Sequence, residues 1–133
     1  MNLALKIAIV AVGGALGALG RTGLTAAVAS VQSNAALSGK ILGTMVVNLV
    51  GCFLMGTARS AVEVAGWGSA QMNAFLFSGF LGAFTTFSTF EANTLTLWRD
   101  GQRLAAAIYM GGSVAGGVVA FLLGWTLCMK FTG

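Results

Sequence analysis

GFLGAFTTFSTF, residues 79–90, is an apolar stretch with four hydroxyl side chains set between phenylalanines. β-Branched and hydroxyl residues in a row crowd the first side-chain torsion and offer the backbone competing hydrogen bonds, so a membrane helix is expected to break here. Backbone groups freed by a break are tolerated in hydrocarbon only where protein buries them or where they line a polar cavity. The stretch therefore predicts a functional site.

The phenylalanines around the break have two interpretations. A phenyl ring is negative on its faces and positive around its edge, so the edge can meet an anion without offering a proton. Alternatively, the spacing i, i+3, i+7, i+10 is that of an ordinary packing stripe; it is shown by Phe77, Phe80, Phe84 and Phe87. Spacing alone leaves both interpretations open.

The composition is that of a membrane protein. The chain has 133 residues, of which 57% are hydrophobic and 8% charged, and it contains no proline and no histidine. A membrane-spanning helix needs about 20 apolar residues, and four such blocks occur, at about residues 3–29, 41–61, 72–98 and 104–129. We expect a single four-span transmembrane domain over residues 1–133. A signal peptide is a rival interpretation of the first block, which the three further spans disfavour.

Several other classes of protein are disfavoured by the residues that are present. Cys52 and Cys128 lie in apolar segments, where a free cysteine acts as a small hydrophobe. Without histidine and with only three acidic residues, the chain cannot assemble a transition-metal site or a catalytic triad, so we expect neither an enzyme nor an organic cofactor. The net charge of +4 is scattered along the chain and indicates no nucleic-acid patch.

The basic residues are nearly balanced between the two sides of the membrane. Four spans place three of them on the side of the termini and four on the other side: Lys6, Arg59 and Lys130 against Arg21, Lys40, Arg99 and Arg103. Because lysine and arginine in short loops orient membrane proteins, this bias is either a weak orientation signal or none. In the second case insertion in both directions is possible, and an antiparallel dimer is permitted.

The first span carries Gly13 and Gly17 at the GxxxG spacing and ends at Arg21. Small residues at this spacing allow two helices to approach closely, so we interpret the glycines as packing residues. Arg21 either anchors the helix end at the interface or draws anions into a vestibule.

The second and fourth spans each present polar groups on one face, Thr44 with Asn48 and Tyr109 with Ser113, both at i and i+4. Asn48 either donates hydrogen bonds to a permeating ligand or clips two helices together. The inward polar groups are mostly donors, which suit a small hard anion, and no histidine offers a proton relay. A four-helix bundle has no obvious lumen, so a pathway is expected to need two copies.

These residues resemble the Fluc, or CrcB-type, family of bacterial fluoride channels over essentially the whole chain. The matching pieces are GGALGALGR at 13–21, GTMVVNLVG at 43–51, GFLGAFTTFSTF at 79–90 and YMGGS at 109–113. The resemblance implies an all-α membrane protein with a broken third helix, assembled as an antiparallel dual-topology dimer in the bacterial inner membrane. It also implies passive export of fluoride from the cytoplasm through pores in that dimer.

The resemblance further implies roles for individual residues. Phe87 and Phe90 would line the pores, and Asn48 would donate a hydrogen bond to fluoride. A polar track would include Ser88, Thr89, Tyr109 and Ser113, and Arg21 would lie in a vestibule. A structural sodium ion on the dimer axis would be held by the backbone carbonyls of Gly82 and Thr85.

The chain departs from the family pattern after its FSTF. Glu91, Ala92 and Asn93 follow, so that Asn93 stands at the family's usual glutamate position, and Ala83 replaces a frequent glycine. The departure leaves a homodimer and a pair with a homologous second subunit both open. We expect Glu91 itself to lie in a vestibule.

The residues disfavour two other functions. A small multidrug-resistance-type proton/cation exchanger would need a carboxylate within its first span, which has none. A purely structural membrane subunit would leave the polar break without a purpose.

Overall fold

The computed structural model describes residues 1–31, 38–64, 66 and 68–132, and their regular structure is all helical. Three helices are long: α1 (Leu3–Val31), α2 (Gly39–Val64) and α6 (Arg103–Thr132). Between α2 and α6 the chain forms four shorter helical segments, α3 (Ala70–Asn73), η1 (Ala74–Leu81), α4 (Gly82–Phe84) and α5 (Phe87–Arg99). The all-helical class expected from the sequence is confirmed.

Three helices, α1, α2 and α6, are long and apolar enough to cross a bilayer. Many of their large hydrophobic side chains are exposed, including Leu3, Leu19, Val114 and Val118. Such surfaces are stable when they face lipid rather than water, which makes the chain a multi-pass membrane protein. Between residues 70 and 99 the described segments are each shorter than such a helix, because the backbone is divided there.

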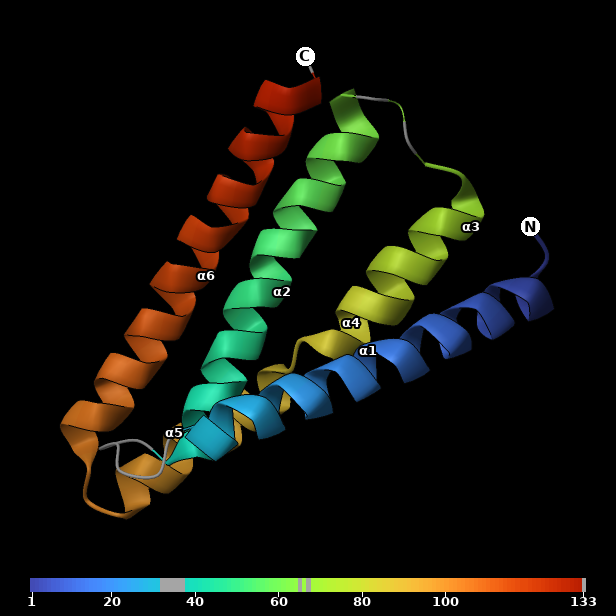
Figure 1. Cartoon of the computed structure of the whole chain (residues 1–133). Coiled ribbons are helices and arrows are strands. Elements are labelled where there is room, and N and C mark those ends of the chain that lie inside the picture. Colours follow the sequence, from blue (N-terminus) through green and yellow to red (C-terminus); the bar gives the residue numbers. More distant parts are fainter. Residues whose placement is uncertain (32–37, 65, 67, 133) are drawn as a thin grey trace.

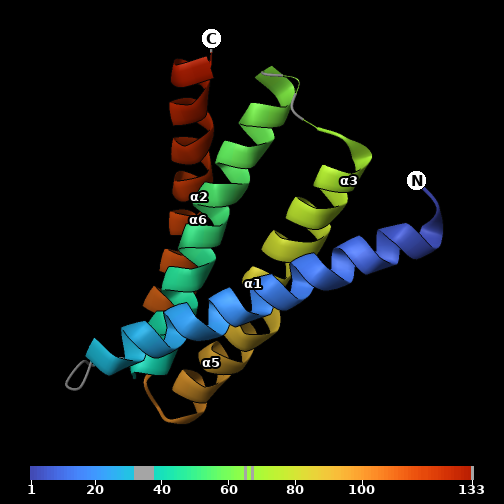
Figure 2. The same ribbon diagram turned by 45° about the vertical axis from the view of Figure 1, so that its right-hand side comes forward.

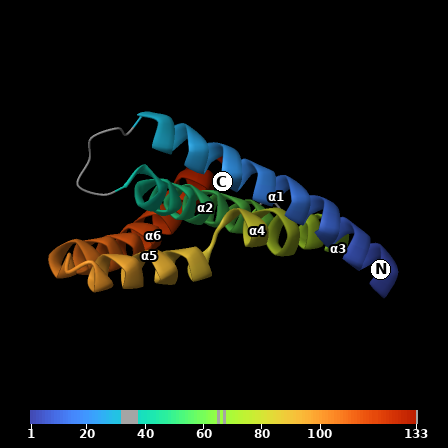
Figure 3. The ribbon, with the colours of Figure 1, turned by 90° about the horizontal axis from the view of Figure 1, so that it is seen from below.

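Helices α2 and α6 lie side by side along most of their length, while α1 crosses the molecule obliquely (Figures 1 and 2). The N-terminus of α1 and the C-terminus of α6 lie at the end where α2 finishes and α3 begins (Figure 1). At the opposite end, α5 lies beside the start of α6 (Figure 3), and a buried cluster forms there from Ile41, Phe90, Leu97, Ala106 and Tyr109.

Close contact between α1 and η1 depends on glycine. A Cβ atom built on Gly13 would lie 2.6 Å from the carbonyl oxygen of Phe75, and one on Gly17 would overlap the carbonyl of Phe80. Gly79 on the facing segment is equally restricted, since its Cβ would lie 3.0 Å from Cα of Gly13. The interpretation of the GxxxG spacing as a packing device is confirmed, and it places the segment before the break firmly against α1.

Segment η1 is wound as a π-helix over eight residues. π-Helical turns are rare and occur frequently at functional sites. Here the wider turns run from Ala74 to Leu81, and the three residues of α4 separate them from Thr85, where the backbone leaves the helical conformation.

Candidate functional site

Thr85 and Thr86 separate α4 from α5, and both have extended backbone conformations. The amide of Thr85 and its hydroxyl both donate to the carbonyl of Leu81, at 3.2 and 3.0 Å. This side-chain bond to the residue four positions earlier is the local competition that weakens a helix at threonine. Thr86 then caps α5, because its Oγ1 accepts a hydrogen bond from the amide of Thr89 at 3.3 Å.

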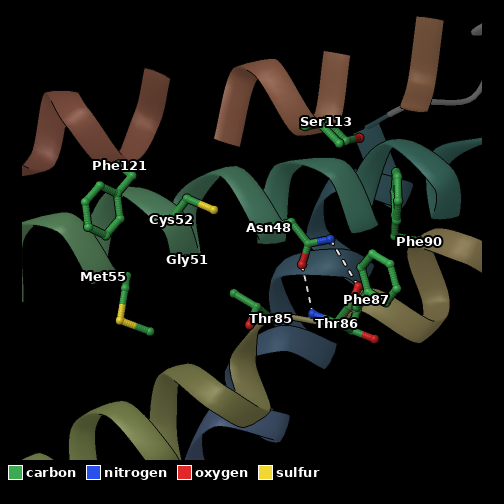
Figure 4. Close-up of a pocket in the computed structure, with 11 residues that line it drawn as sticks. Asn48, Gly51, Cys52, Met55, Thr85, Thr86, Phe87, Phe90, Ser113 and Phe121 are labelled. Atoms are coloured by element: carbon green, nitrogen blue, oxygen red, sulfur yellow. Dashed lines mark hydrogen bonds between the residues drawn. The ribbon is translucent and has the colours of Figure 1, made fainter. Parts of the chain in front are cut away.

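Asn48, on the neighbouring helix α2, forms hydrogen bonds with the backbone of the interruption. Its Oδ1 accepts from the amide of Thr86 at 2.8 Å, and its Nδ2 donates to the carbonyl of Thr86 at 3.1 Å (Figure 4). One side chain thus satisfies both backbone groups of the same residue in the break. Asn48 therefore connects α2 to the interruption, as one of its two interpretations predicts. One N–H of its amide remains available to another acceptor, as the other interpretation requires.

These bonds release two backbone carbonyls. In a continuous helix the amide of Thr86 would bond the carbonyl of Gly82, and the amide of Thr89 would bond that of Thr85. Both amides instead donate to side chains, Asn48 Oδ1 and Thr86 Oγ1. Gly82 is exposed and Thr85 is half-buried. Carbonyl oxygens are the ligands that a hard cation such as sodium prefers, so these residues fit the sodium ion that the family resemblance implies.

The aromatic residues divide into two groups at the break. Phe80 and Phe84 stack with ring centroids 5.8 Å apart, and the guanidinium of Arg59 lies 4.3 Å above the ring of Phe77. The packing interpretation therefore fits Phe80 and Phe84, and Phe77 instead contacts a cation. Phe87 leaves that stripe, because its side chain is 74% exposed.

Beyond the break, three rings follow one another from α5 to α6. Phe87 and Phe90 have centroids 5.7 Å apart at 41°, and Phe90 and Tyr109 have centroids 5.5 Å apart at 37°. Tilted rings of this kind present edges rather than faces to part of their surroundings. Phe90 is 6% exposed and Tyr109 1%, so the row runs from the protein surface into the buried cluster.

A pocket of about 300 Å³ lies beside the break (Figure 4). It brings together four of the predicted site residues with one of the proposed cation ligands: Asn48, Phe87, Phe90, Ser113 and Thr85. The hydroxyl of Ser113 is buried, and within the described part of the chain no hydrogen-bond partner reaches it. Cys52 and Phe121 also line this pocket, although no motif in the sequence relates either residue to the break.

A second pocket, of about 760 Å³, lies between α1, α2 and α5, and we call it the basic pocket. Its charged lining residues are Arg21 and Lys40, and its other polar lining includes Thr86, Thr89 and Asn93. Lysine, arginine and the positive N-terminal end of α5 all favour anions there. Neither Lys40 nor Asn93 was among the predicted site residues. Lys40 lies at the start of the second span, and Asn93 stands where the family usually has glutamate.

Two residues named from the sequence line neither of these pockets. Ser88 is exposed and lines neither of these two pockets; its hydroxyl lies 3.5 Å from that of Thr86. Glu91 lines a separate pocket of about 400 Å³ with Trp98 and Met110. Glu91 and Asn93 are two positions apart on α5 and therefore lie on different faces of that helix, so a vestibule position for Glu91 stays a prediction and would differ from that of Asn93.

Comparison with known proteins identifies the family. A family model described as "CrcB-like protein, Camphor Resistance (CrcB)" matches residues 8–125. A protein of Paracoccus denitrificans named "Fluoride-specific ion channel FluC" is 39% identical over 118 residues, covering 89% of this chain and 90% of that protein. Proteins with the same name from Chlorobium phaeobacteroides (strain BS1) and Acidobacterium capsulatum are 36% and 42% identical, covering 68% and 62% of this chain and 70% and 66% of theirs. The relatives are thus named as ion channels and not as enzymes, and the chain belongs to the CrcB-like family.

Proposed function

We propose that this protein is a fluoride channel that exports fluoride passively from the cytoplasm across the bacterial inner membrane. Relatives that are 39% and 42% identical to the chain over the aligned residues are named fluoride-specific ion channels. The observation that carries the proposal is the interruption at Thr85 and Thr86, where backbone, hydroxyl and amide groups meet phenyl rings at one place. A small anion can exchange its water shell for such donors and ring edges.

The path that we propose begins in the basic pocket. Arg21 attracts the anion there, and the hydroxyls of Thr89 and Ser88 stand near the cap of α5. The row of Phe87, Phe90 and Tyr109 and the hydroxyl of Ser113 then provide edges and donors, with the remaining N–H of Asn48 beside them. These roles are proposals for each residue, supported by the two pockets and the ring contacts.

We further propose that residues 70–99 form the third membrane span, broken at its centre. Helix α5 has 13 residues, or about 20 Å at 1.5 Å per residue, which is too short for a hydrocarbon core of about 30 Å. Together with α3, η1 and α4 it reaches that thickness. A break inside the bilayer is stable where side chains satisfy the freed backbone groups, and Asn48 does this for Thr86.

The working unit in this proposal is an antiparallel dimer, either of two identical chains or with a homologous second subunit. Phe87 is 74% exposed in the single chain, so a pore lined by its ring is incomplete without a covering partner. The near balance of three against four basic residues on the two sides allows both orientations in the membrane.

We propose that sodium binds at the dimer axis between the two breaks. The carbonyl oxygens of Gly82 and Thr85 from each copy would hold it, since the amides that would otherwise bond them are occupied. When bound, the ion supplies positive charge that compensates converging carbonyl dipoles and thereby joins the two copies.

The test is anion efflux from liposomes that contain only this protein. Fluoride should leave rapidly down its gradient while chloride is retained, because a narrow path of hydrogen-bond donors binds the small anion more favourably than the large one. Equal efflux of the two anions, or none of either from folded protein, would show the proposal to be mistaken.

A further inference from the structure

Asn93 connects the basic pocket to a buried tyrosine. Its Nδ2 donates to the hydroxyl oxygen of Tyr109 at 3.3 Å, which joins α5 to α6. Asn93 also lines the basic pocket together with Arg21 and Lys40. Tyr109 is 1% exposed, and its ring packs at 5.5 Å against Phe90. The amide therefore stands between the entrance that we propose for the anion and the row of rings.

The direction of this hydrogen bond determines what the tyrosine hydroxyl can do. A phenol has one O–H to donate and lone pairs with which to accept. Here the oxygen accepts from Asn93, so its own hydrogen must point away from the amide. Among the described residues, none accepts that hydrogen. Asn93 satisfies the oxygen as an acceptor, while the O–H is left as a donor that a ligand could use.

We propose that Asn93 is a positioning residue. Because Asn93 donates to the hydroxyl oxygen of Tyr109, the phenolic O–H is directed away from the amide and toward the permeating fluoride. This inference rests on the proposed channel function and explains why the O–H of Tyr109 would point toward the anion. Ser113 lies one helical turn beyond Tyr109 on the same face, and its buried hydroxyl also lacks a partner among the described residues. The two hydroxyls form successive donors on α6.

An amide and a carboxylate differ sharply at this position. A carboxylate only accepts hydrogen bonds, so an aspartate at residue 93 would take the O–H of Tyr109 and leave oxygen lone pairs facing the anion. It would also place a negative charge in the basic pocket. Leucine has the same branched arrangement of side-chain heavy atoms as asparagine, although it is larger, and it would remove the donor without adding charge, so the hydroxyl would be free to rotate.

The experiment combines fluoride efflux from liposomes with resonance Raman spectra of tyrosine. Tyr109 is the only tyrosine in the chain, so the intensity ratio of its ring doublet reports directly whether its hydroxyl donates or accepts. Wild-type protein without fluoride should show an accepting hydroxyl, and fluoride should shift the ratio toward donation. Asn93→Asp should show a donating hydroxyl that does not respond to fluoride, with efflux reduced about tenfold or more, as for loss of a hydrogen bond to a charged group.

Asn93→Leu separates positioning from charge. It should lower efflux less than Asn93→Asp and abolish the accepting signature. In a Tyr109→Phe background the leucine substitution should lower efflux no further, because the group that it positions is absent. Additive losses in the double variant would overturn the proposal.

The matched control for charge is Ser30→Asp, which adds a carboxylate to the same basic pocket from α1. An equal loss of efflux in Ser30→Asp and Asn93→Asp would show that charge alone matters and would overturn the positioning role. An unchanged Raman doublet between wild type and Asn93→Leu would do the same. Absence of fluoride efflux from wild-type protein would instead refute the channel function, and the spectra of the fluoride-free variants would still test the positioning of Tyr109.

Discussion

Replacing Asn48 by aspartate is the sharpest test of the break. The carboxylate can still accept from the amide of Thr86, but it cannot donate to the carbonyl, which now lies 3.1 Å from Nδ2. Loss of that bond leaves a part-buried carbonyl unsatisfied, which costs about 1–3 kcal/mol of stability. The substitution thus weakens the link between α2 and the interruption.

The effect on fluoride is larger. An anion passing about 4 Å from the new carboxylate is repelled by about 4 kcal/mol at an effective dielectric constant of about 20. Since 1.4 kcal/mol corresponds to about a tenfold change, fluoride efflux should fall by about a thousandfold. The repulsion acts on the permeating ion, so this loss should exceed any loss of folded protein.

The assay is fluoride efflux from liposomes, with thermal unfolding of the same purified protein. Asn2→Asp makes the same chemical change at the start of α1, where the side chain only accepts from the amide of Leu5, and should leave efflux intact. Asn48→Ala removes both bonds without charge and should give an intermediate loss. Folded Asn48→Asp protein with wild-type efflux would refute the placement of Asn48 beside the anion path.

Three further predictions concern neighbouring residues. Phe87→Ala should abolish most fluoride efflux with little loss of stability, because the ring is 74% exposed, whereas Phe90→Ala should also lower the free energy of unfolding by about 3–5 kcal/mol; equal stability losses in denaturant titrations would contradict this. Gly17→Ala should destabilise the protein strongly, because its Cβ would overlap the carbonyl of Phe80, while the control Gly23→Ala meets no atom within 4 Å and should be neutral in the same titration. Thr85→Ala should retain sodium-dependent dimerisation, measured by sedimentation, because the carbonyl that we propose as the ligand is kept; loss of dimerisation there would indicate that the hydroxyl is the ligand.

The orientation hypothesis has its own test. Three lysines added to the loops on one face should force a single orientation and abolish efflux, because no antiparallel pair can form. Co-expression with the oppositely biased variant should restore it. Full activity from either biased protein alone would show that the antiparallel arrangement is wrong.

Much of the architecture could be predicted from the sequence because it depends on local properties. Apolar blocks at residues 3–29, 41–61 and 104–129 correspond to the helices Leu3–Val31, Gly39–Val64 and Arg103–Thr132. The interruption also has a local cause, since Thr85 bonds the carbonyl of Leu81 within its own turn. The close approach at Gly13 and Gly17 follows from the absence of a side chain, whichever segment lies opposite.

Only the tertiary structure decided which polar groups pair. Asn48 and Thr86 are 38 residues apart, and Asn93 and Tyr109 are 16 apart on different helices, so no periodicity relates them. Phe87 and Phe90 occupy similar positions in the sequence, yet one is exposed and the other is packed against Tyr109. Long-range packing sets the rotation of each helix, and that rotation determines which donors remain free for an ion.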